Sequence, residues 1–367
     1  MIVLTARTGE VQEHAVDFSQ DNQQTSGSSE AAGSGDEEPK LVYYAKDKAL
    51  QMSCSEHTQE LRTGQLMRIV SWNTGYGALG DNADFFMDGG THVYTASRSR
   101  VEENLLAIRN ELQQLSPDVI FLQEVDTDSA RSYRTDESAV FRAVYNSMDM
   151  NLALNFKTMF LPYPLPPIGK VESGIMTLSS YRIAEAERVQ LPCPFKWPVR
   201  VVNLKRCLLL SRLPVADSTK EVVLINLHLE AFDDGEGKIA QTKALLSVME
   251  SEREKGNYVI VGGDFNQTFS NYEDRRPEVQ EGLWTPGMID ASAFGDSWQL
   301  LMDGSTPSGR SLDRPYEGAE DTGFQFYLID GFIVSDNVKV NAVATQNLGF
   351  RAADHNPVVL DVELMQG

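Results

Sequence analysis

The chain has 367 residues, of which 41% are hydrophobic and 23% are charged, and this length allows one large domain or two ordinary ones. Because it contains 27 Gly, 15 Pro and no long heptad array, its composition excludes the collagen-like, coiled-coil and low-complexity classes. The 53 Asp and Glu residues outnumber the 32 Lys and Arg residues, and the net charge of -21 disfavours nucleic acid as a partner, since duplex binding depends on basic side chains.

The first 64 residues are predicted to be a disordered or poorly ordered acidic segment that precedes a single domain over residues 65–367. Residues 1–40 contain eight acidic and two basic side chains, and a stretch this polar buries too little apolar surface to offset its ordering entropy. Residues 1–8 lack the basic start and the apolar length of a signal peptide. No apolar run suggests a transmembrane segment. The compartment stays open: the cytoplasm, or export if a leader precedes this sequence.

From residue 66 onward, predicted strands alternate with two predicted helices, which is typical of an α/β domain. The first helix begins at Ser99, whose spacing to Glu102 matches a capping box, and ends before Pro117. The second covers residues 238–255 and is stopped by Gly256. The predicted strands are residues 67–72, 118–122, 172–178, 199–210, 221–229, 258–261, 326–334 and 356–364.

Several predicted strands end in a polar side chain of a catalytic type, namely Asn73, Glu124, His228, and Asp264 with Asn266. In layered α/β folds, strand ends and the loops that follow them build the functional sites. Any one of these residues has a structural explanation, because Asn and Asp cap turns and a Glu after a strand is commonly solvated. The set as a whole favours a site. The chain contains neither a P-loop nor a nucleophile elbow.

Six sequence blocks carry these residues and three more: SWN, LQE, NLH, GGDFN, IDGFIVS and DHNPV, which include Asp330, Asp354 and His355. In order and spacing they resemble the endonuclease/exonuclease/phosphatase superfamily, which includes pancreatic-type deoxyribonuclease, abasic-site endonucleases, bacterial sphingomyelinases and inositol-polyphosphate 5-phosphatases. FFMDGG at 85–90 and RSYR at 131–134 are similar to uncharacterised bacterial members. The resemblance covers about residues 67–364. It implies a deoxyribonuclease-like fold, a four-layer α/β/β/α sandwich with two central mixed sheets.

The resemblance also implies hydrolysis of a phosphoester by water, assisted by Mg²⁺, with Mn²⁺ as an alternative. Mg²⁺ prefers a few carboxylates together with water and phosphate oxygens. Glu124 is the best ligand on this basis, with Asn73 and Asp354 beside it. Ala353 stands where members often have Ser, which removes a hydroxyl but no expected ligand.

Five residues are predicted to act in catalysis. Asp264 takes a proton from the attacking water or holds it in line, and Asn266 donates to the nucleophile or a phosphoryl oxygen. Asp330 fixes the tautomer of His355 and raises its pKa, so that the imidazole stays charged against the phosphate. His228 is a second donor. The structural alternatives are a turn cap for His355, a buried hydrogen-bonded ring for His228 and a structural role for Asp330.

Four basic residues are candidates for binding a second anionic group of the substrate: Arg131, Arg134, Lys205 and Arg206. For each of them ordinary ion pairing is the favoured alternative. The Pro-rich, aromatic stretch at 160–170 is predicted to be a rigid packed surface loop, with a substrate wall or a lipid-facing lip as alternatives.

Together these patterns predict a monomeric, Mg²⁺-dependent hydrolase that cleaves a small or lipid phosphoester. The same site in a nuclease is the first alternative, and it needs a local basic groove that a sequence cannot show. A non-catalytic binding module with the same fold is the second.

Overall fold

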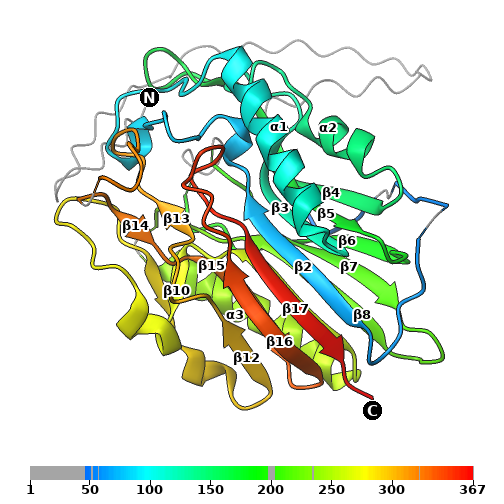
Figure 1. Cartoon of the computed structure of the whole chain (residues 1–367). Coiled ribbons are helices and arrows are strands. Elements are labelled where there is room, and N and C mark those ends of the chain that lie inside the picture. The colour runs from blue at the N-terminus through cyan, green and yellow to red at the C-terminus, as the bar shows by residue number, and fades with distance from the viewer. Residues whose placement is uncertain are drawn as a thin grey trace, which may run out of the picture.

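The computed structural model describes residues 46–50, 53–56, 58–196, 203–233, 235–321 and 323–366, and within them two mixed β-sheets pack face to face (Figure 1). The seven-stranded sheet has the order β1 (Lys48–Ala49), β6 (Glu185–Gln190), β7 (Cys207–Pro214), β8 (Glu221–His228), β9 (Tyr258–Asp264), β15 (Asp330–Ser335) and β12 (Trp298–Leu301). The six-stranded sheet has the order β16 (Val338–Thr345), β17 (Val358–Leu364), β2 (Leu66–Asn73), β3 (Val119–Asp126), β5 (Gly169–Ser179) and β4 (Asp149–Leu161). The predicted pair of central mixed sheets is confirmed.

Helices cover the outer faces of both sheets, as Figure 1 shows. Ile108 and Leu112 of α1 (Arg98–Leu115) and Phe141 of α2 (Glu137–Val144) pack on the six-stranded sheet. Leu245 and Met249 of α3 (Glu236–Glu254) pack on the seven-stranded sheet. No helix in the described part of the chain is long and apolar enough to span a bilayer.

Central strands are buried on both faces, which explains their continuous apolar runs. In β3, Phe121 faces the other sheet, whereas Ile120 and Leu122 face the helices. Phe332 and Ile260 of the seven-stranded sheet pack in the same core as Phe121. Gly262 leaves room for the Phe332 ring, because an added Cβ there would lie 2.5 Å from it. This core holds the carboxyl ends of several strands side by side.

Shorter elements connect the sheets near those strand ends. Two small ladders pair β10 (Gln267–Phe269) with β11 (Gly287–Ile289) and β13 (Gly309–Arg310) with β14 (Phe326–Tyr327). The 3₁₀ turns are η1 (Gly75–Gly77), η2 (Phe86–Asp88), η4 (Ser270–Arg275) and η5 (Ala291–Phe294).

Some predicted boundaries were wrong. Ser97, not Ser99, caps α1, since its side chain accepts a hydrogen bond from the Arg100 backbone N–H at 3.2 Å. The strand predicted at 199–210 begins only at Cys207; part of it lies outside the described residues. The run predicted at 326–334 is divided between β14 and β15, because Leu328 and Ile329 join two different sheets.

The segment before residue 65 contributes to the fold where the structure describes it. β1 pairs antiparallel with β6, and Leu61 is buried in the core between the sheets. The first 45 residues lie outside the described part, so their predicted disorder stays a prediction.

Candidate active site

The strand register brings predicted site residues to one edge of the sheets. His228 is the last residue of β8 and pairs with Asp264, the last residue of the parallel strand β9. Asp264 in turn pairs with Asp330, the first residue of the antiparallel strand β15. Asn73 ends β2 of the other sheet, and its Nδ2 donates to Asp264 Oδ2 at 3.0 Å, so the site bridges both sheets.

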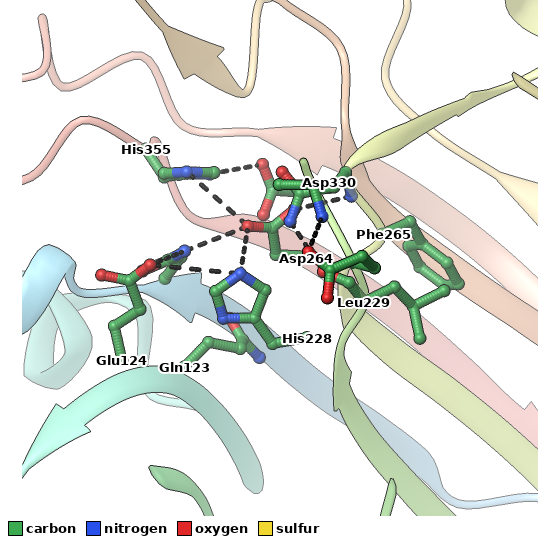
Figure 2. A network of polar contacts seen from close by, with 12 residues as sticks. Gln123, Glu124, His228, Leu229, Asp264, Phe265, Asp330 and His355 are labelled. Carbon is green, nitrogen blue, oxygen red and sulfur yellow. Dashed lines mark hydrogen bonds and ion pairs between the residues drawn. The ribbon is translucent and has the colours of Figure 1, made fainter. Parts of the chain in front are cut away.

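Glu124 reaches this edge because β3 is irregular where Glu124 lies. The ladder with β5 shifts register between Leu122 and Val125, and Glu124 has a φ of 57°. Such a bulge re-aims a side chain. Glu124 Oε1 lies 4.0 Å from His228 Nε2 and 3.5 Å from Asn73 Nδ2, and the side chain stays partly exposed. Figure 2 shows Glu124, His228, Asp264, Asp330 and His355 turned toward one another.

His355 and Asp330 form a buried pair on one side of Asp264. His355 Nδ1 lies 2.8 Å from Asp330 Oδ2, and its Nε2 lies 3.8 Å from Asp264 Oδ2. Burial favours the neutral ring, but the carboxylates of Asp330 and Asp264 outweigh it and raise the pKa of His355 well above its ordinary value. The two carboxylates therefore favour the charged form of the ring, with Nδ1 held by Asp330 and Nε2 directed toward Asp264.

His228 lies on the other side of Asp264 with the opposite electrostatics. Its Nε2 is 3.3 Å from Asp264 Oδ2, whereas its buried Nδ1 has no hydrogen-bond partner in the described structure. Burial, followed by the positive charges of Arg206 and His355, lowers the pKa of His228 well below its ordinary value. The surroundings thus favour the charged form of the His355 imidazole and the neutral form of the His228 imidazole.

Asp264 lies at the centre of these contacts. Burial and the neighbouring carboxylate of Asp330 raise its pKa to about 7, the range in which a group can both accept and release a proton. The backbone N–H of Asn266 donates to Asp264 Oδ1 at 2.8 Å, and the Asn266 side chain donates to Leu229 O at 3.0 Å. Asn266 thereby holds the turn after β9, while its predicted contact with substrate stays a prediction.

An oxygen-rich group lies beside the imidazoles. The Oδ1 atom of Asp354 is buried without a hydrogen-bond partner in the described structure, and an added Cβ at Gly75 would lie 2.7 Å from it. Burial and the charge of Glu124 raise the pKa of Asp354 to about 6. Two carboxylates and the Asn73 amide oxygen form a donor set of the kind that hard divalent cations prefer, so the residues fit a metal ion.

A second grouping also has the chemistry of metal ligands. Ligand atoms of Asp264, Asp330 and His355 all lie within 4.8 Å of one another, and all three residues are buried. Two of these residues already bind each other through the Asp330–His355 contact. In the set of Glu124, Asp354 and Asn73, by contrast, Asp354 Oδ1 has no hydrogen-bond partner in the described structure.

Two of the predicted substrate-binding residues have partners in their own loop. Both Asp126 oxygens accept from Arg131, at 2.9 and 3.1 Å, and the Arg131 guanidinium lies 3.6 Å from the centroid of the Tyr76 ring. Arg134 is exposed and donates to Asp128 at 2.8 Å. Ion pairing, the alternative favoured from the sequence, describes both residues in this structure.

The other two predicted substrate-binding residues are buried, and one of them contacts His228. Arg206 is buried, with Nε 3.7 Å from Glu230 Oε2, and its Nη1 donates to His228 O at 3.4 Å. Lys205 is also buried, and its Nζ donates to Asn203 O at 2.8 Å. The buried positive charge of Arg206 therefore contributes to lowering the pKa of His228.

The structure adds two residues that the sequence reasoning did not assign to the site. Asp88 lies in η2, and burial together with the carboxylates of Asp354 and Glu124 raises its pKa to about 7. Tyr76 has a buried hydroxyl with no hydrogen-bond partner in the described structure, and it directly follows Gly75, where an added Cβ would lie 2.7 Å from Asp354 Oδ1. Both residues lie in the loop between β2 and α1, and only the FFMDGG block drew attention to that loop.

Comparison with known proteins agrees with this architecture. The model of the endonuclease/exonuclease/phosphatase family matches residues 70–349, so the chain belongs to this family. It is a hydrolase of phosphoester bonds, as members of the family are. No curated protein sequence matches the chain.

Solved structures with the same fold are distant in sequence. An endonuclease/exonuclease/phosphatase from Beutenbergia cavernae DSM 12333 is 18% identical, with a TM-score of 0.55 over 82% of this chain and 72% of that one. ANGEL2, a 2',3'-cyclic phosphatase, is 13% identical, with a TM-score of 0.53 over 88% and 99%. TDP2 from C. elegans is 14% identical, with a TM-score of 0.51 over 83% and 77%. At such low sequence identities, the similarity to these structures shows a shared fold and not a shared substrate.

Proposed function

We propose that the chain is a Mg²⁺-dependent phosphoesterase that hydrolyses a small or lipid phosphoester. The observation that carries this proposal is the position of Asp264, whose Oδ2 lies 3.3 Å from His228 Nε2 and 3.8 Å from His355 Nε2 and accepts a hydrogen bond from Asn73. One buried carboxylate thus contacts both imidazoles and an amide whose oxygen belongs to the proposed metal set.

The proposed roles follow from the charges. Asp264, with a pKa of about 7, accepts a proton from the attacking water. The water oxygen forms a bond to phosphorus while the bond from phosphorus to the ester oxygen breaks. His355, held by Asp330, places a charged N–H against a phosphoryl oxygen. His228 adds a neutral donor on the other side. When Mg²⁺ is bound by Glu124, Asp354 and Asn73, it polarises the phosphoryl group and stabilises the leaving oxygen.

A small or lipid substrate is favoured over nucleic acid by two observations. Arg131 and Arg206, the predicted basic residues nearest the site, are paired with Asp126 and Glu230 inside the protein. The net charge of -21 repels a polyanion.

The test is a panel of substrates with Mg²⁺: bis-nitrophenyl phosphate, nitrophenyl phosphate, plasmid DNA, sphingomyelin and inositol phosphates. We expect hydrolysis of at least one ester and its loss by about 10³-fold in His355→Ala. His92→Ala is the matched control, because His92 also pairs with a carboxylate, Asp84, but is largely exposed.

Two outcomes would contradict the proposal. Mg²⁺-dependent plasmid nicking at low salt that His355→Ala abolishes, without cleavage of the small or lipid esters, would support the nuclease instead. No hydrolysis across the panel with Mg²⁺ or Mn²⁺ would support a binding module.

A further inference from the structure

An apolar projection extends from the six-stranded sheet where β4 turns into β5. The ten residues 159–168 read MFLPYPLPPI and include no charged side chain, in a chain that is 23% charged. Leu165 is 88% exposed and Phe160 is 58% exposed, and Met159 and Tyr163 are exposed as well. Apolar side chains gathered on a surface in this way mark an interaction site.

The η2 turn adds to the same surface. Met87 is exposed, and the ring of Phe86 packs edge-on against that of Tyr163 with their centroids 6.3 Å apart. Tyr94, farther along the β2–α1 loop, donates to the carbonyls of Pro167 and Ile168 at 3.2 and 3.3 Å. Figure 1 shows the two connections at the same end of the molecule. The apolar tip comprises Phe86, Met87, Met159, Phe160, Tyr163 and Leu165.

These side chains are concentrated rather than scattered. Of the eleven large hydrophobic side chains that are exposed in the described part of the chain, five belong to the apolar tip. Four of the ten residues at 159–168 are proline, which has no backbone N–H. The tip therefore exposes few polar donors and loses few hydrogen bonds with water when it enters an apolar environment.

The apolar tip is continuous with the candidate active site. Met87 lies in the loop that follows β2, and the backbone N–H of Phe85 in this loop donates to Leu312 O at 2.8 Å. Two residues before Leu312, the backbone N–H of Arg310 donates to Asp354 O at 3.0 Å. A surface that binds the tip would thus lie beside the carboxylates and imidazoles that are proposed to act on a phosphoester.

The charges behind the tip indicate what kind of surface this is. Lys157 pairs with Glu172 at 2.9 Å. Lys170 and Arg134 both pair with Asp128. These three cations and two anions leave a net charge of only +1 at the base of the tip, and the chain as a whole carries -21. Attraction to anionic lipid is disfavoured, whereas burial of apolar side chains in a zwitterionic lipid surface needs no positive charge.

We propose that the apolar tip docks on the surface of a zwitterionic phospholipid bilayer and presents lipid phosphoesters to the active site. This inference rests on the proposed function and names the physical form of its substrate, a lipid held in a membrane. Docking uses the burial of side chains, so it is insensitive to salt.

The experiment measures co-sedimentation of the full chain with vesicles of palmitoyl-oleoyl phosphatidylcholine. We expect binding that persists at high salt and that does not increase when phosphatidylserine is added. In Phe160→Ser and Leu165→Ser the bound fraction falls about tenfold. The matched control is Ile239→Ser, because Ile239 on α3 is 57% exposed, nearly the same as Phe160, but lies outside the tip.

Activity separates docking from catalysis. Hydrolysis of soluble bis-nitrophenyl phosphate is expected to be unchanged in Phe160→Ser and Leu165→Ser, while hydrolysis of phospholipid vesicles falls with the bound fraction. If the wild type cleaves the soluble ester but does not bind phosphatidylcholine vesicles, docking is wrong and the proposed function stands. Vesicle binding without cleavage of any ester overturns the proposed function and leaves the docking surface.

Other occupants give different results. A dimer of the wild type that becomes monomeric in Leu165→Ser, measured by light scattering, would assign the tip to a second copy of the chain and overturn the lipid assignment. Binding that requires phosphatidylserine and disappears at high salt would overturn the apolar mechanism.

Discussion

Two buried polar clusters lie at opposite ends of β8 and β9, and they differ in how completely their groups are paired. At the amino ends, Glu252 accepts hydrogen bonds from Arg212 at 2.7 and 2.9 Å and from Asn257 at 2.9 Å, and Asn257 also accepts from the Glu221 backbone N–H. At the carboxyl ends, the site leaves His228 Nδ1 without a partner in the described structure, and Asp264 adjoins the second carboxylate Asp330.

The pKa values express this difference. Burial alone would raise the pKa of Glu252, but hydrogen bonds from Arg212, Lys255 and Asn257 lower it to about 2. Burial and Asp330 raise the pKa of Asp264 to about 7. Paired buried charges stabilise the fold, whereas a buried group without its partner costs stability unless a ligand completes it. The comparison predicts that changes at one cluster alter stability and changes at the other alter activity.

The largest expected effect is that of Asp264→Asn, which removes the proposed base. We expect kcat on the best ester of the panel to fall by about 10³-fold. The free energy of unfolding should stay the same or rise, because the neutral amide relieves the repulsion from Asp330. Steady-state kinetics and urea denaturation check the two parts. Full activity in this variant would remove Asp264 from the mechanism.

A smaller loss is expected for Asp330→Asn, about 10²-fold in kcat. Asp330 raises the pKa of His355, and the charged ring is lost as the pH rises through that value. The substitution lowers the pKa of His355, so the alkaline fall of activity moves to lower pH. A pH–rate profile measures this shift. An unchanged alkaline limb would mean that Asp330 does not control the charge of His355.

Glu124→Gln tests the oxygen-rich group. We expect the Mg²⁺ concentration for half-maximal activity to rise about tenfold, with little change in the stability of the metal-free protein. Titration calorimetry gives the Mg²⁺ affinity independently of turnover. The matched control is Glu172→Gln, which makes the same substitution in an ion pair with Lys157. Gln123→Glu is unsuitable, because Gln123 donates a hydrogen bond to Asn226 between the sheets. Equal Mg²⁺ affinity in Glu124→Gln and wild type would exclude Glu124 as a ligand.

Much of the fold and of the site's membership could be predicted from the sequence, because both depend on local patterns. Asn73, His228 and Asp264 each end a continuous apolar run, and such runs end at the edge of a sheet. The two central sheets and the family resemblance were confirmed. The roles of these site residues stay predictions.

Other features depend on contacts that no local pattern encodes. Arg206 pairs with Glu230, which is 24 positions away, and the positive φ of Glu124 arises from a register shift against β5. Asp88 lies in an irregular loop that is held by a residue far along the chain, since the backbone N–H of Phe85 donates to Leu312 O at 2.8 Å. These are properties of packing, so the sequence showed the residues but not their partners.

The smallest expected effect is a change in stability, and it concerns the cluster of Glu252, Arg212 and Asn257 at the amino ends of β8 and β9. Glu252→Gln should lower the free energy of unfolding by about 2 kcal/mol at pH 7 and leave kcat unchanged, because it removes a carboxylate bound by Arg212 and Asn257. The folded pKa of about 2 lies below the ordinary value of 4.5, so this contribution is complete above pH 4.5 and is lost as the pH falls toward 2. Urea denaturation of both proteins between pH 7 and 3.5 should therefore show a difference that narrows below pH 4.5. A constant difference would mean that Glu252 stabilises the fold by packing rather than by charge, and the contrast with the active site would then not be electrostatic.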